Sequence, residues 1–180
     1  MTALEYQLKN QQRVIIRKAE PEDAKEMVSV MKTAFDETRF LSRNADEFQT
    51  TPEQERVFIE NVAADPNQEL YVALYEDQVI GICSVGRVRT HQRYRHRAET
   101  AFMILKKYCG LGIGGKMMQE CIAWCREHQI SQLELSVIKD NQHAIQMYQD
   151  FGFTIVGCMP HAFHYEDGTY ADEYDMVLPL

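Results

Sequence analysis

The 180-residue chain lacks several features that mark special classes of protein. It has no apolar run of about 18 residues, which a membrane-spanning helix would need. It has no excess of basic residues: 19 Lys and Arg stand against 27 Asp and Glu, which disfavours binding to the nucleic-acid backbone. The segment Met1 to Gln12 is polar and lacks the apolar part of a signal peptide. We therefore expect a cytoplasmic protein that binds neither membrane nor nucleic acid.

The cysteines also lack the spacing of a disulfide framework or a metal site. Their odd number and irregular spacing do not indicate disulfides, and Cys121 and Cys125 lack two further ligands at a metal-binding distance. His161 and His164, with the acids that follow them, fit no metal template either. We predict reduced thiols and no metal site. The five cysteines are Cys83, Cys109, Cys121, Cys125 and Cys158.

What the sequence does have is a regular succession of strand and helix patterns. Its apolar content of 45% and its length suit one globular domain over residues 1–180. A 3.6-residue apolar period predicts helices beginning near Glu20 and Thr51, the second with Val57 and Phe58 among its apolar positions, and helices at 117–128 and 142–151. Strands are predicted at 13–19, 70–75, 79–88, 98–105, 132–138, 153–156 and 174–178. The order βααβββαβαββ predicts an α/β domain with a mixed, partly antiparallel central sheet flanked by helices.

One stretch organises the rest of the chain: four glycines lie within the six residues from Gly110 to Gly115, between a strand and a helix. Glycines let the backbone approach an anion, and the N–H groups of a helix N-terminus point at it, so this arrangement suits phosphate. A P-loop would need Ser or Thr where Met117 follows Lys116. A dinucleotide fold would need an acid at the end of the next strand, whereas Glu134 lies near its start. A purely structural turn is a third interpretation.

Two motifs resemble those of the GNAT superfamily of acetyl-CoA-dependent N-acetyltransferases. Cys109-Gly110-Leu111-Gly112-Ile113-Gly114 is similar to the family's Arg/Gln-x-x-Gly-x-Gly pyrophosphate loop. Val137-x-x-Asp140-Asn141-x-x-Ala144-x-x-x-Tyr148-x-x-x-Gly152-Phe153 is similar to its strand-to-helix segment on the other side of the cofactor. The spacing of the motifs and the element order also match, over nearly the whole chain. Cys109 departs from the family's Arg or Gln, which predicts weaker pyrophosphate binding.

The resemblance implies where acetyl-CoA would lie. The glycine turn would hold the pyrophosphate, and the preceding strand would pair with the pantetheine arm as an added strand does. Asn141 would contact that arm, a role compatible with that of a plain helix N-cap. The implied cofactor-binding residues are Phe102, Met103, Ile104, Cys109, Gly110, Leu111, Gly112, Ile113, Gly114, Gly115 and Asn141.

The resemblance also implies two catalytic residues. Tyr148 lies where many family members use a tyrosine as general acid, and it would protonate the departing thiolate; the alternative is a packing role. Glu99 is our candidate base for the substrate amine, acting through water; the alternative is a solvated strand carboxylate. The acids Asp172, Glu173 and Asp175 either attract a cationic acceptor or are ordinary surface charges.

The predicted activity is direct transfer of the acetyl group of acetyl-CoA to a primary amine of a small molecule or peptide. The acidic balance favours a cationic acceptor such as a polyamine, in a pocket shaped by residues 35–48 and 160–170. The basic segment 87–97 would be an exposed loop, or would meet the 3′-phosphate of coenzyme A or an acidic acceptor. The alternative function is a catalytically silent acyl-CoA-binding sensor. A homodimer is compatible with the resemblance.

Overall fold

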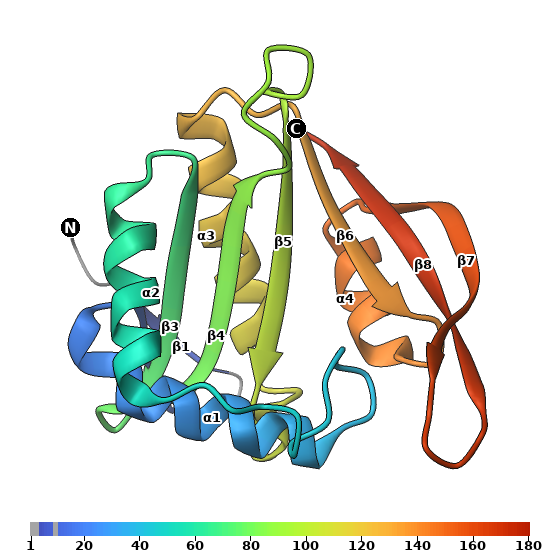
Figure 1. Ribbon diagram of the computed structural model, residues 1–180. Helices are drawn as coiled ribbons and strands as arrows, with labels where there is room; N and C mark the ends of the chain where they lie inside the picture. The colour runs from blue at the N-terminus through green and yellow to red at the C-terminus, as the bar shows by residue number, and fades with distance from the viewer. Residues whose placement is uncertain (1–3, 9–10) are drawn as a thin grey trace.

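The computed structural model in Figure 1 describes residues 4–8 and 11–180. In this part of the chain eight strands form one sheet in the order β1-β2-β3-β4-β5-β6-β8-β7. All neighbouring strands pair antiparallel except β5 and β6, so the sheet is mixed as predicted. The elements are β1 (Leu4–Gln7), β2 (Arg13–Lys18), α1 (Ala24–Glu37), α2 (Pro52–Ala64), β3 (Gln68–Tyr75), β4 (Gln78–Arg87), β5 (Arg97–Ile104), α3 (Ile113–Glu127), β6 (Gln132–Ile138), α4 (Gln142–Asp150), β7 (Thr154–His164) and β8 (Tyr170–Pro179).

The predicted order of elements is confirmed with two differences, both at strands on the edges of the sheet. β1 was not predicted, because it has only four residues and they are mostly exposed. β7 extends to His164, so the predicted loop 160–170 shrinks to a turn. Most of β7 is exposed, and a strand with both faces exposed lacks the period of two that marks a half-buried strand.

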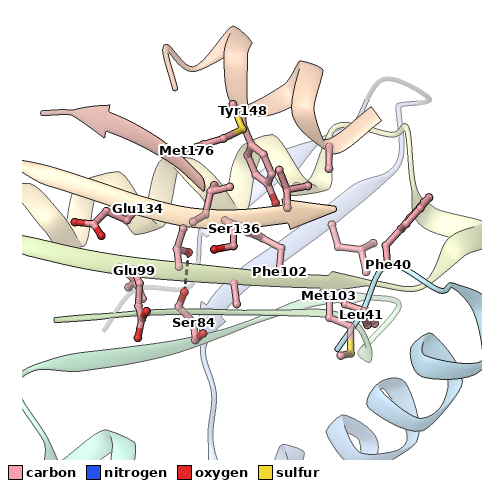
Figure 2. Close-up of a pocket in the computed structure, with 18 of the residues that line it drawn as sticks. Phe40, Leu41, Ser84, Glu99, Phe102, Met103, Glu134, Ser136, Tyr148 and Met176 are labelled. Atoms are coloured by element: carbon pink, nitrogen blue, oxygen red, sulfur yellow. Dashed lines mark hydrogen bonds between the residues drawn. The ribbon is translucent and has the colours of Figure 1, made fainter. Parts of the chain in front are cut away.

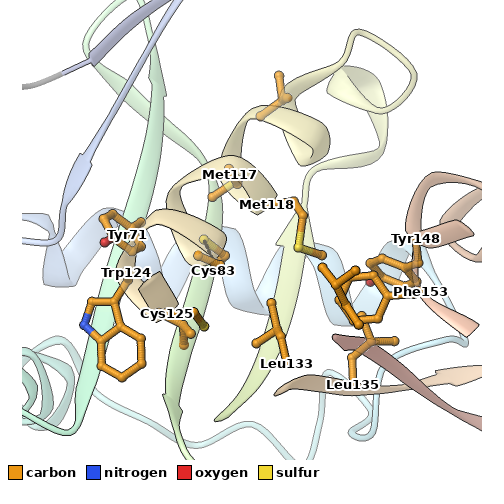
Figure 3. Close-up of a cluster of buried hydrophobic side chains, with 14 of the residues drawn as sticks. Tyr71, Cys83, Met117, Met118, Trp124, Cys125, Leu133, Leu135, Tyr148 and Phe153 are labelled. Atoms are coloured by element: carbon orange, nitrogen blue, oxygen red, sulfur yellow. Dashed lines mark hydrogen bonds between the residues drawn. The ribbon is translucent and has the colours of Figure 1, made fainter. Parts of the chain in front are cut away.

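The helices cover the two faces of the sheet. α1 and α2 pack on one face, where Met27, Ile59 and Val72 belong to one buried cluster. α3 and α4 lie on the other face, over a larger core that Figure 3 shows. Cys121 and Cys125 of α3 are fully buried there, with free thiols. No helix in the described ranges is long and apolar enough to cross a bilayer.

The apolar positions of α2 divide between surface and core. Val57 and Phe58 are 47% and 48% exposed, whereas Ile59 and Val62 are buried. The helix carries apolar residues on two adjacent stripes, and helical period alone does not say which stripe meets the sheet. The capping box between Thr51 and Gln54 was predictable, because it depends on residues three apart.

The pairing of β5 with β6 positions the site. The two strands are parallel and pair over three residues, Arg97–Glu99 opposite Gln132–Glu134. β5 stays paired with β4 as far as Ile104, and β6 stays paired with β8 as far as Ile138. Beyond Glu99 and Glu134 the strands therefore part, and β5 has no strand partner on that side.

We predict that Gly152→Ala lowers the free energy of unfolding by about 1–2 kcal/mol, the cost of a left-handed backbone at a residue with a Cβ. Gly152 follows α4 with φ +98°, as the sequence predicts for a helix C-terminus. Urea unfolding measures the effect. Gln149→Ala, at an exposed position of the same helix, is the control and should change stability by less than about 0.5 kcal/mol. Equal stability of both variants would contradict the prediction.

Candidate functional site

The gap between β5 and β6 opens into a cleft of about 2100 Å³. Its walls include the glycine turn, strands β4, β5, β6 and β8, α4, and the segment after α1. Figure 2 shows that side chains reach it from both sides of the sheet, with Tyr148 on one side and Glu99 on the other. This volume exceeds that of a typical small-molecule pocket, about 300–1,000 Å³, so two ligands can bind side by side.

The glycine turn presents backbone N–H groups at one end of the cleft. Gly112 is the N-cap of α3 with φ +94°, and the first helical bond runs from Lys116 N to Gly112 O at 3.2 Å. The N–H groups before Lys116 therefore have no acceptor within the helix. A Cβ added at Gly110 or Gly112 would meet no atom within 4 Å, so the space above the turn is open. The first turn of α3 has no acidic residue, and the site suits an anion.

Two other residues of the turn serve packing. A Cβ on Gly114 would lie 2.9 Å from the Met147 sulfur and 3.4 Å from Ile104 Cδ1, so glycine lets α3 approach α4 and β5 closely. Leu111 is the one predicted cofactor residue that does not line the cleft. Its side chain packs against the core instead. The other predicted cofactor residues all line the cleft.

Asn141 lines the cleft and lies at the start of α4. Its side-chain oxygen accepts a hydrogen bond from Ala144 N at 3.4 Å, which makes it the N-cap. The cap uses only the oxygen, so the side-chain NH2 group is able to donate to a ligand. The cap and the ligand contact are therefore compatible in this geometry.

Tyr148 is buried on α4 and still borders the cleft. Its ring packs between Phe102 and Phe153, with centroid distances of 6.2 and 5.7 Å. Burial raises the pKa of Tyr148 to about 12, with a smaller contribution from the nearby Cys121. The hydroxyl is therefore protonated at neutral pH and is a proton donor, held in place by aromatic packing.

Glu99 lines the cleft from β5 and is exposed. It lies at the last residue pair of the β5–β6 ladder, opposite Glu134. Side chains alternate along a strand, so Glu99 and Met103 face one side of the sheet while Phe102 faces the side of Tyr148. The structure thus places Tyr148 and Glu99 on the same cleft but on opposite sides of β5, and the gap between the strands connects them.

An ion pair closes the narrow end of the gap. Arg97 donates to both carboxylate oxygens of Glu134, at 2.5 and 2.7 Å, and Gln132 donates to one of them at 2.8 Å. The Arg97 hydrogen bond lowers the pKa of Glu134, and the same bond raises the pKa of Arg97. Sequence reasoning considered Glu134 only as the acid of a dinucleotide fold, and its place near the start of a strand argued against that role. Its partner lies 37 residues away and is identified only once β5 and β6 are adjacent.

Cys109 lies at the edge of the cleft before the glycine turn. Its sulfur is 3.8 Å from the Ile104 carbonyl oxygen and 3.7 Å from that of Leu105. Partial burial of the sulfur and the Glu37 carboxylate raise the pKa of the Cys109 thiol. A neutral thiol is a poor nucleophile, so this site does not favour a covalent acyl-cysteine intermediate.

The predicted acidic residues divide into two groups. Asp172 pairs with Lys139 at 3.4 Å and accepts from the His161 backbone, and it does not line the cleft. Glu173 and Asp175 do line the cleft. Burial raises the pKa of Glu173, and the charge of Asp175 adds to this effect.

The basic segment 87–97 precedes β5, whereas the glycine turn follows β5. An eight-residue strand spans about 23 Å at 3.3 Å per residue, so this loop does not reach a phosphate on the glycine turn. This distance does not favour the alternative role of the loop at the 3′-phosphate of coenzyme A. Arg89 and His91 instead border the opposite end of the cleft.

Sequence reasoning missed Ser136, and it placed Phe40 and Leu41 only within the predicted pocket segment 35–48. Ser136 lies on β6 across the gap, and its hydroxyl donates to Asp175 at 3.0 Å. Phe40 and Leu41 line the cleft from the segment after α1. No motif marks these residues. Within the described ranges no group of three or more His, Cys, Asp or Glu side chains could hold a metal ion.

Comparison with known proteins agrees with this geometry. Residues 29–153 match the family model described as Acetyltransferase (GNAT) family. The chain is 28% identical over 119 residues to the L-amino acid N-acetyltransferase AaaT of Escherichia coli, covering 66% of this chain and 72% of that protein. It is 30% identical over 87 residues to the spermine/spermidine N(1)-acetyltransferase of Bacillus subtilis, covering 46% of this chain and 57% of that protein.

Two solved structures share the fold. An acetyltransferase of the GNAT family from Streptococcus pneumoniae has a TM-score of 0.87 and 30% identity, over 93% of this chain and 99% of that chain. A protein from Salmonella typhimurium, solved with its cofactor acetyl-CoA, has a TM-score of 0.80 and 20% identity, over 93% of this chain and 94% of that chain.

We predict that Glu134→Gln destabilises the protein by about 1 kcal/mol at pH 7, because Arg97 loses its charged partner on a partly exposed surface. The folded-state pKa of Glu134 is lowered, so its contribution is present above the unfolded-state pKa, about 4.3, and is lost as pH falls through the folded-state value. The difference between variant and wild type should therefore shrink below about pH 4.

Urea unfolding at pH 7, 5 and 3.5 measures this difference. Glu5→Gln is the matched control, because its pair with Arg13 is exposed and should contribute little. A difference for Glu134→Gln that does not depend on pH would show that the ion pair does not stabilise the fold.

Proposed function

The chain belongs to the GNAT family of acetyltransferases, and on this premise we propose that it transfers the acetyl group of acetyl-CoA directly to a primary amine. One observation carries the proposal. A single cleft joins an open phosphate cradle, an unpaired strand edge and a buried, protonated tyrosine. These three parts fit the pyrophosphate, the pantetheine amides and the sulfur of acetyl-CoA in that order.

The cradle and the strand edge would orient acetyl-CoA. The free N–H groups at the start of α3 would bind the pyrophosphate. The pantetheine amides would pair with the edge of β5 beyond Glu99, as an added strand does. Phe102, Met103 and Ile104 would then flank the thioester, and a backbone N–H near Ile104 would stabilise the oxyanion.

Glu99 and Tyr148 would move the protons. A lysine-like ammonium has a pKa of about 10.4, so Glu99 would take its proton through water before the amine attacks the thioester carbon. As the C–N bond forms and the C–S bond breaks, Tyr148 would donate its hydrogen bond to the departing sulfur. The pKa of Tyr148, about 12, exceeds that of a thiol, about 8.5, so proton transfer from Tyr148 to the sulfur is unfavourable on its own. The transfer is completed as the attacking nitrogen, which must lose a proton to form the amide, supplies a proton that replaces the one lost by Tyr148.

The acceptor is proposed to be a small molecule or peptide with a primary amine. Two relatives carry names that state amino-acid and spermine or spermidine acetylation, and both substrate classes contain primary amines. The acids Glu99, Glu173 and Asp175 line the cleft and favour a cationic amine. The departure at Cys109 favours a second candidate function, a catalytically silent acyl-CoA-binding sensor.

We predict that the wild-type protein releases free coenzyme A from acetyl-CoA when given an amine from a panel of spermine, L-leucine and an alanyl peptide. Tyr148→Phe should lower kcat about 100-fold, because it removes the proton donor, and should leave the acetyl-CoA Kd within about twofold. A thiol-release assay and calorimetry measure the two quantities. Tyr94→Phe, outside the cleft, is the control.

Binding of acetyl-CoA without transfer to any amine would favour the sensor over the enzyme. Transfer that is equally fast in Tyr148→Phe would show that Tyr148 is not the proton donor, while the proposed acetyltransferase activity would stand.

We predict that acetyl-CoA slows alkylation of Cys109 by iodoacetamide about tenfold or more, while Cys158 reacts as before. Both thiols are exposed, but only Cys109 lines the cleft. The raised pKa of Cys109 should make its rate climb steadily above pH 9, because the thiolate is the nucleophile. Mass spectrometry of the labelled peptides separates the two sites. Equal rates at Cys109 with and without acetyl-CoA would place the cofactor elsewhere.

A further inference from the structure

Two segments that are far apart in the sequence meet beside the cleft. One is the loop after α1, and the other is the turn between β7 and β8 (Figure 1). The guanidinium carbon of Arg39 lies 3.6 Å from the centre of the Tyr165 ring. An Arg39 nitrogen donates to the Thr169 hydroxyl at 2.9 Å, and the Tyr165 hydroxyl donates to the Arg39 carbonyl at 3.0 Å.

Two weaker contacts extend this junction. Arg39 forms an ion pair with Asp167 at 3.5 Å, and the Asn44 side chain donates to Glu166 at 3.2 Å. We call the whole arrangement the Arg39 clasp: Arg39 and Asn44 on one side, Tyr165, Glu166, Asp167 and Thr169 on the other. Its hydrogen bonds join residues 122 to 130 positions apart.

The receiving turn is well formed by its own local bonds. Gly168 has φ +81°, which the tight turn requires, and the Thr169 backbone N–H donates to Asp167 at 2.9 Å. Hydrogen bonds from Thr169 lower the pKa of Asp167, and Arg39 adds to this effect. Asp167 is therefore a carboxylate at neutral pH, and the turn offers Arg39 a negative charge, a hydroxyl and an aromatic face together.

The clasp holds residues that line the cleft. Phe40 and Leu41 follow Arg39 directly, and Figure 2 shows them beside Met103 at the far end of β5. Both are half-buried, and neither belongs to the hydrophobic clusters identified within the described ranges. The segment from Arg39 to Leu41 has no helix or strand to fix it. Besides a local hydrogen bond from the Phe40 backbone N–H to the Thr38 hydroxyl at 3.2 Å, the contacts of Arg39 tie these two residues to the rest of the fold.

We propose that Arg39 is a positioning residue for acceptor specificity. Seated in the β7–β8 turn, it holds Phe40 and Leu41 as one wall of the cleft and so sets which amines reach the gap between β5 and β6. This inference rests on the proposed acetyl transfer for its kinetic consequence, but the clasp itself is independent of any activity. Arg39 acts through its neighbours and takes no part in the chemistry.

The contacts of the clasp are weak. Arg39 and Asp167 have side chains that are 52% and 55% exposed, and exposed ion pairs and cation–π contacts are individually weak. Breaking the junction leaves no buried charge, so it costs little. A wall held in this way adapts to an incoming amine, whereas the sheet and Tyr148 stay fixed.

The test compares Arg39→Ala with Arg43→Ala. Arg43 is exposed on the same segment and does not line the cleft, so it controls for loss of one positive charge. Arg39→Lys keeps the charge but loses the planar stack and the forked donors, and it should be intermediate. Thermal melting of all variants should stay close to that of wild type, because the clasp lies on the surface.

Hydrogen exchange is the first readout and needs no substrate. Backbone amides of residues 38–48 should exchange at least fivefold faster in Arg39→Ala than in wild type, with no change in Arg43→Ala. Tyr165→Ala should have the same effect, and the double variant Arg39→Ala/Tyr165→Ala should be no faster than either single variant. Unchanged exchange in Arg39→Ala, or additive effects, would overturn the clasp.

Kinetics form the second readout, with spermine and L-leucine as amines. Arg39→Ala should raise KM for the amine at least fivefold, while kcat and the acetyl-CoA Kd stay within about twofold of wild type. A change in kcat or Kd of the same size would overturn the specificity role. If wild type acetylates neither amine, the proposed function fails for these substrates. The exchange data still show whether Arg39 holds residues 38–48 in place.

Discussion

The short pairing between β5 and β6 creates the cleft and fixes the positions of the groups around it. Backbone N–H and C=O groups need partners, and a strand edge without one is a template for another extended chain. Here the ladder ends after Glu99 and Glu134, and the edge of β5 faces an open cleft. The Arg97–Glu134 ion pair closes the narrow end of the gap. A site thus forms inside a continuous sheet without interrupting β4–β5 or β6–β8.

The cleft combines parts that are firmly packed with a wall that is held by exposed contacts. The glycine turn is anchored by α3, whose buried residues pack against the sheet, and Tyr148 is held between two aromatic rings. The wall formed by Phe40 and Leu41 depends on exposed contacts of Arg39. Family members act on different amines, as the names of the two relatives show. A fixed site for the proposed cofactor beside the proposed adjustable wall would suit such variation.

Much of the fold was predictable, because most of its elements bury one face. β6 and α4 follow from their apolar patterns, their caps and Gly152. The edge strands β1 and β7 are mostly exposed and β1 has only four residues, so β1 was missed and β7 was predicted too short. The exposure of Val57 and Phe58 was not predictable, because α2 carries two apolar stripes and only packing selects one.

Features that depend on a few neighbouring residues can be read from the sequence: the left-handed glycines, the Asn141 cap and the strand–turn–helix cradle. Such features rest on backbone sterics and local hydrogen bonds, which a motif records directly. Only the tertiary structure decided that Arg97 meets Glu134, that Arg39 meets Tyr165, and that the basic loop lies far from the cradle. These contacts depend on the order of strands in the sheet, and no local interaction encodes that order.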